Sequence, residues 1–105
     1  MSTKVETKET VSRLIEENKD KVRKFGVERL GLFGSFVRGD QNENSDIDIL
    51  VEFSSDKKNY DNFINLVFFL EEIFQRRVEL VTPESISPYL KPYIMDEVEY
   101  VEIAH

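Results

Sequence analysis

The sequence predicts an α/β fold, of the α+β kind, in which helices pack on a small mixed β-sheet. Helix-like and strand-like segments follow one another along 105 residues, of which 40% are hydrophobic. That length is enough for one hydrophobic core and short for two, so we expect a single domain over residues 1–105. The connection between the first two expected strands is too short for a helical crossover, which favours a mixed sheet.

The first expected element is an amphipathic helix over residues 7–25. Apolar residues recur on it at helical spacing, Thr7 offers an N-cap, and Gly26 is well placed to end it. Residues 27–33 are expected to form a short strand, because the helical period stops there and glycines follow.

Residues 46–53 carry the clearest strand pattern in the chain. Alternation places four apolar side chains on one face and two aspartates on the other, the latter beside Leu50 and Glu52. The apolar face holds Ile47, Ile49, Val51 and Phe53, and the polar face holds Asp46 and Asp48.

The second half of the chain alternates in the same way. A strongly apolar helix is expected over residues 60–75 and a third strand over residues 78–81. Two prolines then separate the third strand from a short helix near residues 89–96. Residues 98–103 fit either a helix end or an edge strand.

Charge and composition exclude several classes of function. Fourteen basic residues against 21 acidic ones give a net charge of −7, which argues against stable nucleic-acid binding. No cysteine is present, so disulfide and thiol chemistry are excluded. The longest apolar stretch, residues 66–70, is too short to span a membrane, and no signal peptide is apparent. We expect a cytoplasmic protein that does not associate with membranes.

A glycine-rich turn after the first strand is the first candidate functional feature. Gly34-Ser35 lets the backbone approach a ligand closely, and Arg38 before Gly39 offers a guanidinium suited to phosphate. The spacing is neither a Walker A loop nor GxGxxG. A plain turn between strands is the alternative.

Asp46 and Asp48 are the second candidate feature. On a strand they lie on one face roughly 6.6 Å apart, and two carboxylates at that distance repel by about 2.5 kcal/mol at an effective dielectric of 20. A divalent cation would reverse the sign of this interaction, and carboxylate oxygens are ligands that Mg²⁺ prefers. Ordinary polar alternation at a strand start is the alternative.

Glu79 is the third feature, a lone acid in the apolar strand 78–81. If this strand neighbours the one that carries Asp46 and Asp48, three carboxylates can converge on one metal site. A solvated glutamate is the alternative. Together the three features are what metal-assisted phosphoryl transfer requires.

The chain resembles the minimal nucleotidyltransferases of the DNA polymerase beta-like superfamily. The resemblance covers nearly all of the chain from about Leu14, and relatives more often carry aspartate at the position of Glu79. The segments that carry it are Gly34-Ser35, Arg38-Gly39, Ser45-Asp46-Ile47-Asp48-Ile49-Leu50-Val51, residues 77–83 and residues 88–94.

The resemblance implies a polymerase beta-like nucleotidyltransferase fold and transfer of AMP from ATP to a hydroxyl. Asp46, Asp48 and Glu79 would be the catalytic residues and would hold two Mg²⁺ ions. The nucleotide would be bound by Gly34, Ser35, Arg38 and Ser45.

The resemblance also implies an acceptor, a tyrosine of a HEPN-type toxin for which this chain is the antitoxin. We expect the acidic C-terminal segment, with Tyr89, Tyr93 and Tyr100, to form part of the partner surface. Two alternatives stay open: a non-catalytic antitoxin that acts by binding alone, and a small-molecule nucleotidyltransferase.

Overall fold

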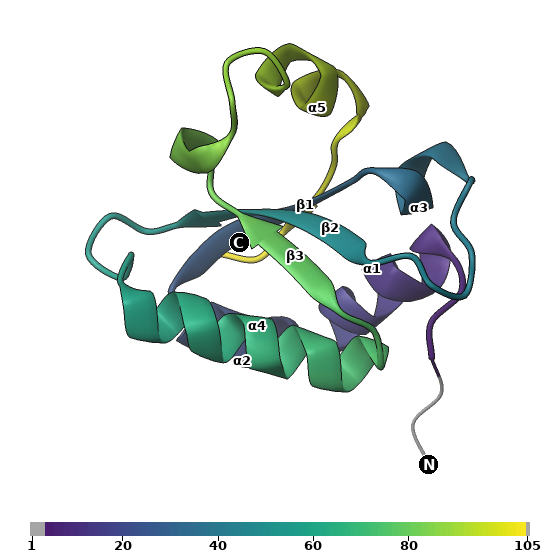
Figure 1. Cartoon of the computed structure of the whole chain (residues 1–105). Helices are drawn as coiled ribbons and strands as arrows, with labels where there is room; N and C mark the ends of the chain where they lie inside the picture. The colour runs from purple at the N-terminus through teal and green to yellow at the C-terminus, as the bar shows by residue number, and fades with distance from the viewer. Residues whose placement is uncertain (1–3, 105) are drawn as a thin grey trace.

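A four-stranded mixed sheet lies at the centre of the structure, a computed structural model that describes residues 4–104 (Figure 1). The strand order is β3-β2-β1-β4, with β1 antiparallel to β2 and β4, and β2 parallel to β3. The elements are α1 (Lys8–Glu17), α2 (Lys19–Lys24), β1 (Val27–Phe33), α3 (Ser35–Arg38), β2 (Ile47–Phe53), α4 (Tyr60–Phe74), β3 (Val78–Val81), a 3₁₀ turn (Pro83–Ser85), α5 (Lys91–Glu97) and β4 (Glu99–Glu102).

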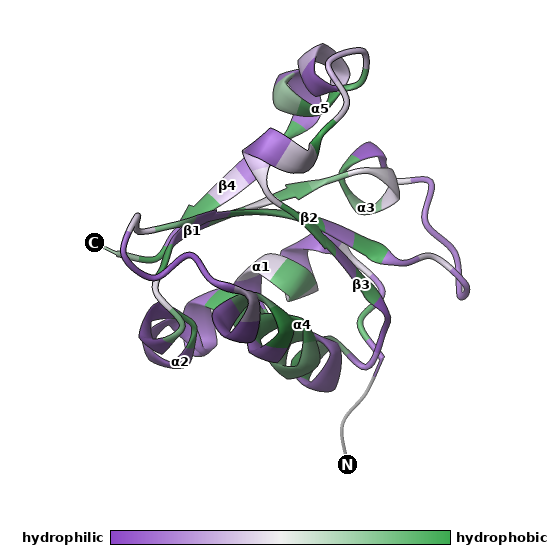
Figure 2. Cartoon of the chain, turned by 60° about the vertical axis from the view of Figure 1, so that its left-hand side comes forward, coloured by the Kyte–Doolittle hydropathy of each residue, from purple (hydrophilic) through white to green (hydrophobic). Residues whose placement is uncertain are grey.

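The hydrophobic core lies between one face of the sheet and three helices. Helices α1, α2 and α4 cover that face, whereas α5 stands beyond the opposite face (Figures 1 and 2). Apolar side chains from both β2 and α4 are fully buried in this core. Among them are Ile47, Ile49, Val51, Leu66, Leu70 and Phe74.

The predicted mixed sheet is confirmed, and its connections explain it. The β1–β2 link holds only the short helix α3, so these strands run antiparallel. Helix α4 provides the crossover that makes β2 and β3 parallel. The strand predicted over residues 46–53 begins one residue later, at Ile47, and its apolar face is the buried one.

The single helix predicted over residues 7–25 is wrong in one respect: the chain forms two helices that meet at Asn18. The Thr7 hydroxyl caps α1 by accepting from the backbone N–H of Thr10, as predicted. Asn18 leaves helical geometry, with φ −108° and ψ 17°, and its side-chain amide donates to the Leu14 carbonyl. This local hydrogen bond replaces the continuing helix and turns the chain.

The C-terminal residues that fitted either a helix end or a strand form β4, which pairs with β1. Gly31 lies opposite Tyr100 in this pairing. A Cβ on Gly31 would lie 2.5 Å from Cγ2 of Val98 and 3.0 Å from Cε1 of Tyr100. Only glycine therefore lets the last strand pack this closely on the first.

No helix in the described part of the chain, residues 4–104, is long and apolar enough to cross a bilayer.

Candidate active site

A pocket of about 550 Å³ lies between α5 and the open face of the sheet. The end of β1, helix α3, strands β2 and β3, and α5 all contribute to its walls. The lining residues are Phe33, Gly34, Arg38, Asp48, Glu79, Val81, Ser85, Ile86, Ser87, Leu90, Tyr93, Ile94 and Glu97. The pocket therefore gathers at least one residue from each of the three motifs found in the sequence.

Gly34 places bare backbone against the side chain of Asp48. Its φ is +80°, and an added Cβ would lie 2.1 Å from Oδ2 of Asp48. A non-glycine residue would therefore be strained by its backbone and would also clash with the carboxylate. The turn thus brings the Gly34 backbone close to the Asp48 carboxylate, and its approach to a bound phosphate stays a prediction.

Asp48 and Glu79 face each other across the parallel pairing of β2 and β3. Burial raises the pKa of Asp48 to about 7, and the neighbouring Glu79 carboxylate adds to the rise through a hydrogen bond and its charge. The charge of Asp46 acts in the same direction, whereas Arg38 opposes it. Burial and the neighbouring carboxylates thus favour the protonated form of Asp48.

The three-carboxylate convergence expected from the sequence is formed only in part. Asp46 is exposed and precedes β2, and it is absent from the pocket lining. Within residues 4–104, no three acidic or histidine side chains form a group that could hold a metal ion. The facing pair Asp48 and Glu79 nevertheless supplies hard oxygen donors, and its mutual repulsion is what a divalent cation would relieve.

Glu97 is the site residue that sequence reasoning missed. Its Oε2 accepts the backbone N–H of Gly34 at 2.6 Å, and both its oxygens accept from Nη1 of Arg38, at 3.2 and 3.3 Å. The same contact raises the pKa of the Arg38 guanidinium. An acid near the end of a short helix carries no signal of such a role, because only the fold brings it across to the glycine turn.

Ser35 and Ser45, both predicted to bind nucleotide, lie outside the pocket lining. Ser35 begins α3, and its carbonyl accepts the backbone N–H groups of Gly39 and Asp40. The Ser45 hydroxyl accepts the N–H of Asn42 at 2.8 Å and so closes the turn before β2. In this structure, the side chain of Ser45 makes its contact within that turn.

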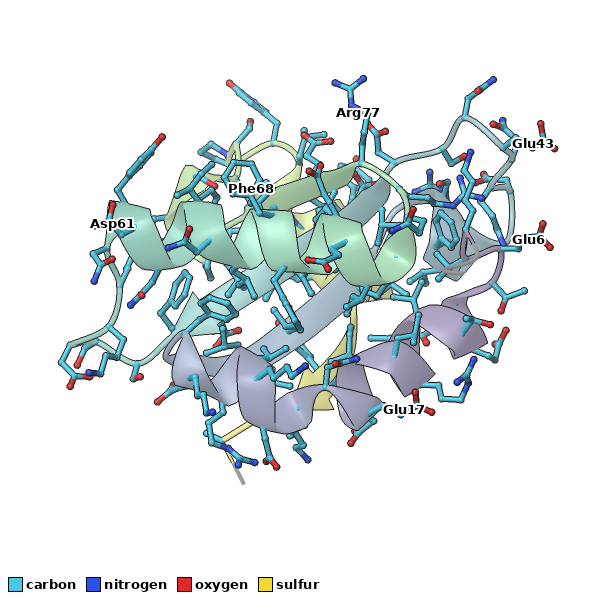
Figure 3. The ribbon with its side chains drawn as sticks, turned by 90° about the horizontal axis from the view of Figure 1, so that it is seen from below. Glu6, Glu17, Glu43, Asp61, Phe68 and Arg77 are labelled. Carbon is cyan, nitrogen blue, oxygen red and sulfur yellow. The ribbon has the colours of Figure 1, made fainter. Side chains whose placement is uncertain are left out.

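Arg76 stabilises this turn through hydrogen bonds from its guanidinium. Only 8% of it is exposed, and its guanidinium lies 5.0 Å from the centre of the Phe36 ring. Arg77, by contrast, points into solvent (Figure 3). The carbonyls that accept from Arg76 belong to Val5, Asn42, Glu43 and Ser45.

We expect Arg76→Met to lower the free energy of unfolding by about 2–4 kcal/mol, because the Val5 carbonyl, in a buried residue, and the Ser45 carbonyl lose this donor. Arg77→Met is the matched control and should change it by less than about 0.5 kcal/mol, since that side chain is exposed. Urea denaturation of the two variants measures both effects. Equal stability of the two variants would contradict the role given to Arg76.

Asp48→Asn is expected to stabilise the fold at pH 8 in the absence of divalent cations. Since the folded state raises the pKa of Asp48 to about 7, the folded protein binds the proton more tightly than the unfolded chain. Wild-type stability therefore falls as pH rises from about 4 to about 7 and is flat above.

Asp48→Asn lacks the titrating carboxyl group, so its stability does not fall in this way as the pH rises. Discounting for the half-exposed position of the group, we expect a gain of about 1–2 kcal/mol at pH 8 that shrinks at pH 5. Urea denaturation at the two pH values tests the sign, and a gain that is independent of pH would contradict it.

A family model described as a nucleotidyltransferase domain matches residues 11–101. MJ1379 of Methanocaldococcus jannaschii, named as a candidate protein adenylyltransferase, is 42% identical over 105 residues, covering 96% of this chain and 100% of that protein. The protein adenylyltransferase MntA of Thermococcus cleftensis is 38% identical over 96 residues, covering 90% of this chain and 96% of that protein.

Among solved structures, a toxin–antitoxin crystal structure with AMP-PNP contains a similar chain. That chain is 28% identical, with a TM-score of 0.60, and the match covers 79% of this chain and 71% of that one.

Proposed function

The chain belongs to the nucleotidyltransferase domain family, and from that membership we propose that it transfers AMP from ATP to a hydroxyl of a partner protein. The observation that carries the proposal is the pocket in which the Gly34 amide and Arg38 lie beside the Asp48–Glu79 pair. Anion-binding groups next to paired carboxylates are what nucleotidyl transfer needs.

Each group of the pocket has a task in this reaction. The Gly34 N–H and the Arg38 guanidinium bind the phosphates, as donors suited to oxyanions. The acceptor oxygen bonds to the α-phosphorus, the bond from that phosphorus to the β-phosphate bridge breaks, and pyrophosphate leaves. The hydroxyl proton passes to a carboxylate oxygen of the Asp48–Glu79 pair, which lines the pocket.

We propose that two Mg²⁺ ions accompany ATP: Asp46 and Asp48 would hold both, and Glu79 would be a ligand only of the ion beside the acceptor hydroxyl. Bound there, Mg²⁺ would neutralise triphosphate charge and lower the pKa of the acceptor hydroxyl. The repulsion within the carboxylate pair supports this assignment, because a pair that is costly alone becomes favourable with a cation between its members.

The proposed acceptor is a tyrosine of a HEPN-type toxin, with this chain as its cytoplasmic antitoxin. Two observations support a protein acceptor. The two relatives described above, both named as protein adenylyltransferases, are matched over 96–100% of their own length, and a similar chain occurs in a toxin–antitoxin complex with AMP-PNP. A phenol also ionises more readily than an aliphatic hydroxyl.

The test is incubation with a HEPN-type partner, ATP labelled at the α-phosphate, and Mg²⁺, followed by mass spectrometry of the partner. Transfer adds one or more AMP groups to a tyrosine. An inhibited partner without adduct would instead support an antitoxin that acts by binding alone. Label found only on an added small hydroxyl compound would support the small-molecule alternative.

Glu79→Gln should lower kcat about 100-fold or more while changing ATP affinity less than about threefold. The reason is that Glu79 serves the acceptor side of the reaction, and an interaction made mainly in the transition state appears in the rate. Single-turnover kinetics and calorimetry separate the two quantities. Glu72→Gln, an exposed glutamate on α4, is the control; full activity of Glu79→Gln would make Glu79 structural.

A further inference from the structure

We propose that Glu97 is a built-in occupant of the phosphate-binding site, held there by α5 and displaced when a triphosphate binds. The proposal rests on the nucleotide-binding part of the proposed function and is independent of the acceptor. It gives α5 a role that neither the sequence motifs nor the relatives assign.

The contacts of Glu97 are those that a phosphate would need. Its carboxylate takes the backbone N–H of Gly34 at 2.6 Å and bridges to Nη1 of Arg38 at 3.2 and 3.3 Å. These are the two donors that the pocket offers to an anion beside Asp48. A carboxylate and a phosphate oxygen are both acceptors with negative charge, so they compete for the same N–H group and repel each other.

Helix α5 can move far enough to break the contact between Glu97 and the two phosphate-binding donors. None of its residues is buried, and it stands away from the sheet opposite the core helices (Figure 1). The strand that follows it is anchored separately, by pairing with β1 and by the buried side chains of Val101 and Ile103. The helix can therefore shift without breaking the sheet or opening the core.

The exposed apolar side chains around α5, one of which also lines the pocket, link this displacement to the partner. Tyr93 is 74% exposed and Met95 is 41% exposed, and Tyr89, just before the helix, is 85% exposed. Tyr100, expected at the same surface, instead packs under Arg29, whose guanidinium carbon lies 3.8 Å from its ring centre. A triphosphate that displaces Glu97 thus also moves the apolar surface around α5, and by linkage a partner that holds α5 outward tightens nucleotide binding.

The test is calorimetry with inorganic triphosphate and with AMP-PNP, each with Mg²⁺. Glu97→Ala and Glu97→Gln should bind both ligands roughly fivefold or more tightly than wild type, because the competing charge is gone. Asp96→Asn is the matched control: it removes one negative charge from the same helix at an exposed position and should change affinity less than about twofold. Thermal melts establish that each variant is folded.

Unchanged or weaker binding by both Glu97 variants would overturn the proposal, and weaker binding would make Glu97 a positioning residue for Arg38. Hydrogen exchange gives a second readout in wild type: saturating triphosphate should speed exchange across residues 91–97, and unaltered exchange would overturn the displacement. Failure of AMP transfer alone leaves this result intact. Failure of every variant to bind either ligand would overturn both the occupant and the proposed function.

Discussion

Replacing Asp46 and Asp48 together with asparagine is expected to abolish AMP transfer and leave the chain folded. Asp48 is the half-buried carboxylate of the pocket lining, and the charge of Asp46, two residues earlier in the chain, acts on it. Without them the proposed cation loses most of its ligands, and the loss of transition-state stabilisation should lower the rate roughly 10³-fold or more. The measurement is the yield of AMP adduct on the partner by mass spectrometry.

Folding should not suffer in this double variant, because the change removes like charges from one face of β2. Asp56→Asn, in the exposed turn before α4, is the control and should transfer AMP at the wild-type rate. An adduct formed at the wild-type rate by the double variant would place the chemistry elsewhere. A double variant that still inhibits the partner, with no adduct in wild type either, would show that binding alone is the activity.

Gly34→Val is expected to abolish triphosphate binding and to lower the free energy of unfolding by about 2–4 kcal/mol. The new Cβ would lie 2.1 Å from Oδ2 of Asp48, in a backbone conformation with φ +80° that valine avoids. The carboxylate or the turn must then move, and either shift separates the Gly34 amide from the rest of the pocket.

Gly39→Ala is the control that separates backbone strain from the clash. Gly39 has nearly the same φ, +81°, but no atom lies within 4 Å of its would-be Cβ. Gly39→Ala should lower the free energy of unfolding by about 1 kcal/mol and leave the affinity for triphosphate close to that of the wild type. Calorimetry and urea denaturation measure both variants, and equal effects at Gly34 and Gly39 would contradict the close approach to Asp48.

Strands with a regular pattern were predictable from sequence, and the reason is local. The alternation in β2 and the short apolar run of β3 each specify which face is buried without reference to distant residues. The break at Asn18 was not predictable, because the apolar period continues through it and only a side-chain hydrogen bond diverts the chain. Whether residues 98–103 form a helix end or a strand depends on their pairing with β1, which is far away in the sequence.

The residues of the candidate site divide in the same way, into those with a local sequence signal and those without one. Gly34 was identified because glycines cluster in that segment, and Asp48 and Glu79 because carboxylates are uncommon in strands; the fold places all three in one pocket. Arg76 and Glu97 were missed because an arginine after a helix and a glutamate at a helix end are ordinary there. Their roles arise from backbone groups of loops that only the tertiary structure brings to them.

The pairing of the last strand with β1 has a consequence for the order of folding on the ribosome. All the residues proposed to bind phosphate and carry the chemistry lie at or before Glu79, so their part of the sheet can form while the C-terminus is still in the exit tunnel. Closing the remaining edge requires the loop from Gly31 to Tyr100, and contacts so distant in sequence form late. A nascent chain would therefore complete its phosphate-binding turn before the segment that carries Glu97 emerges.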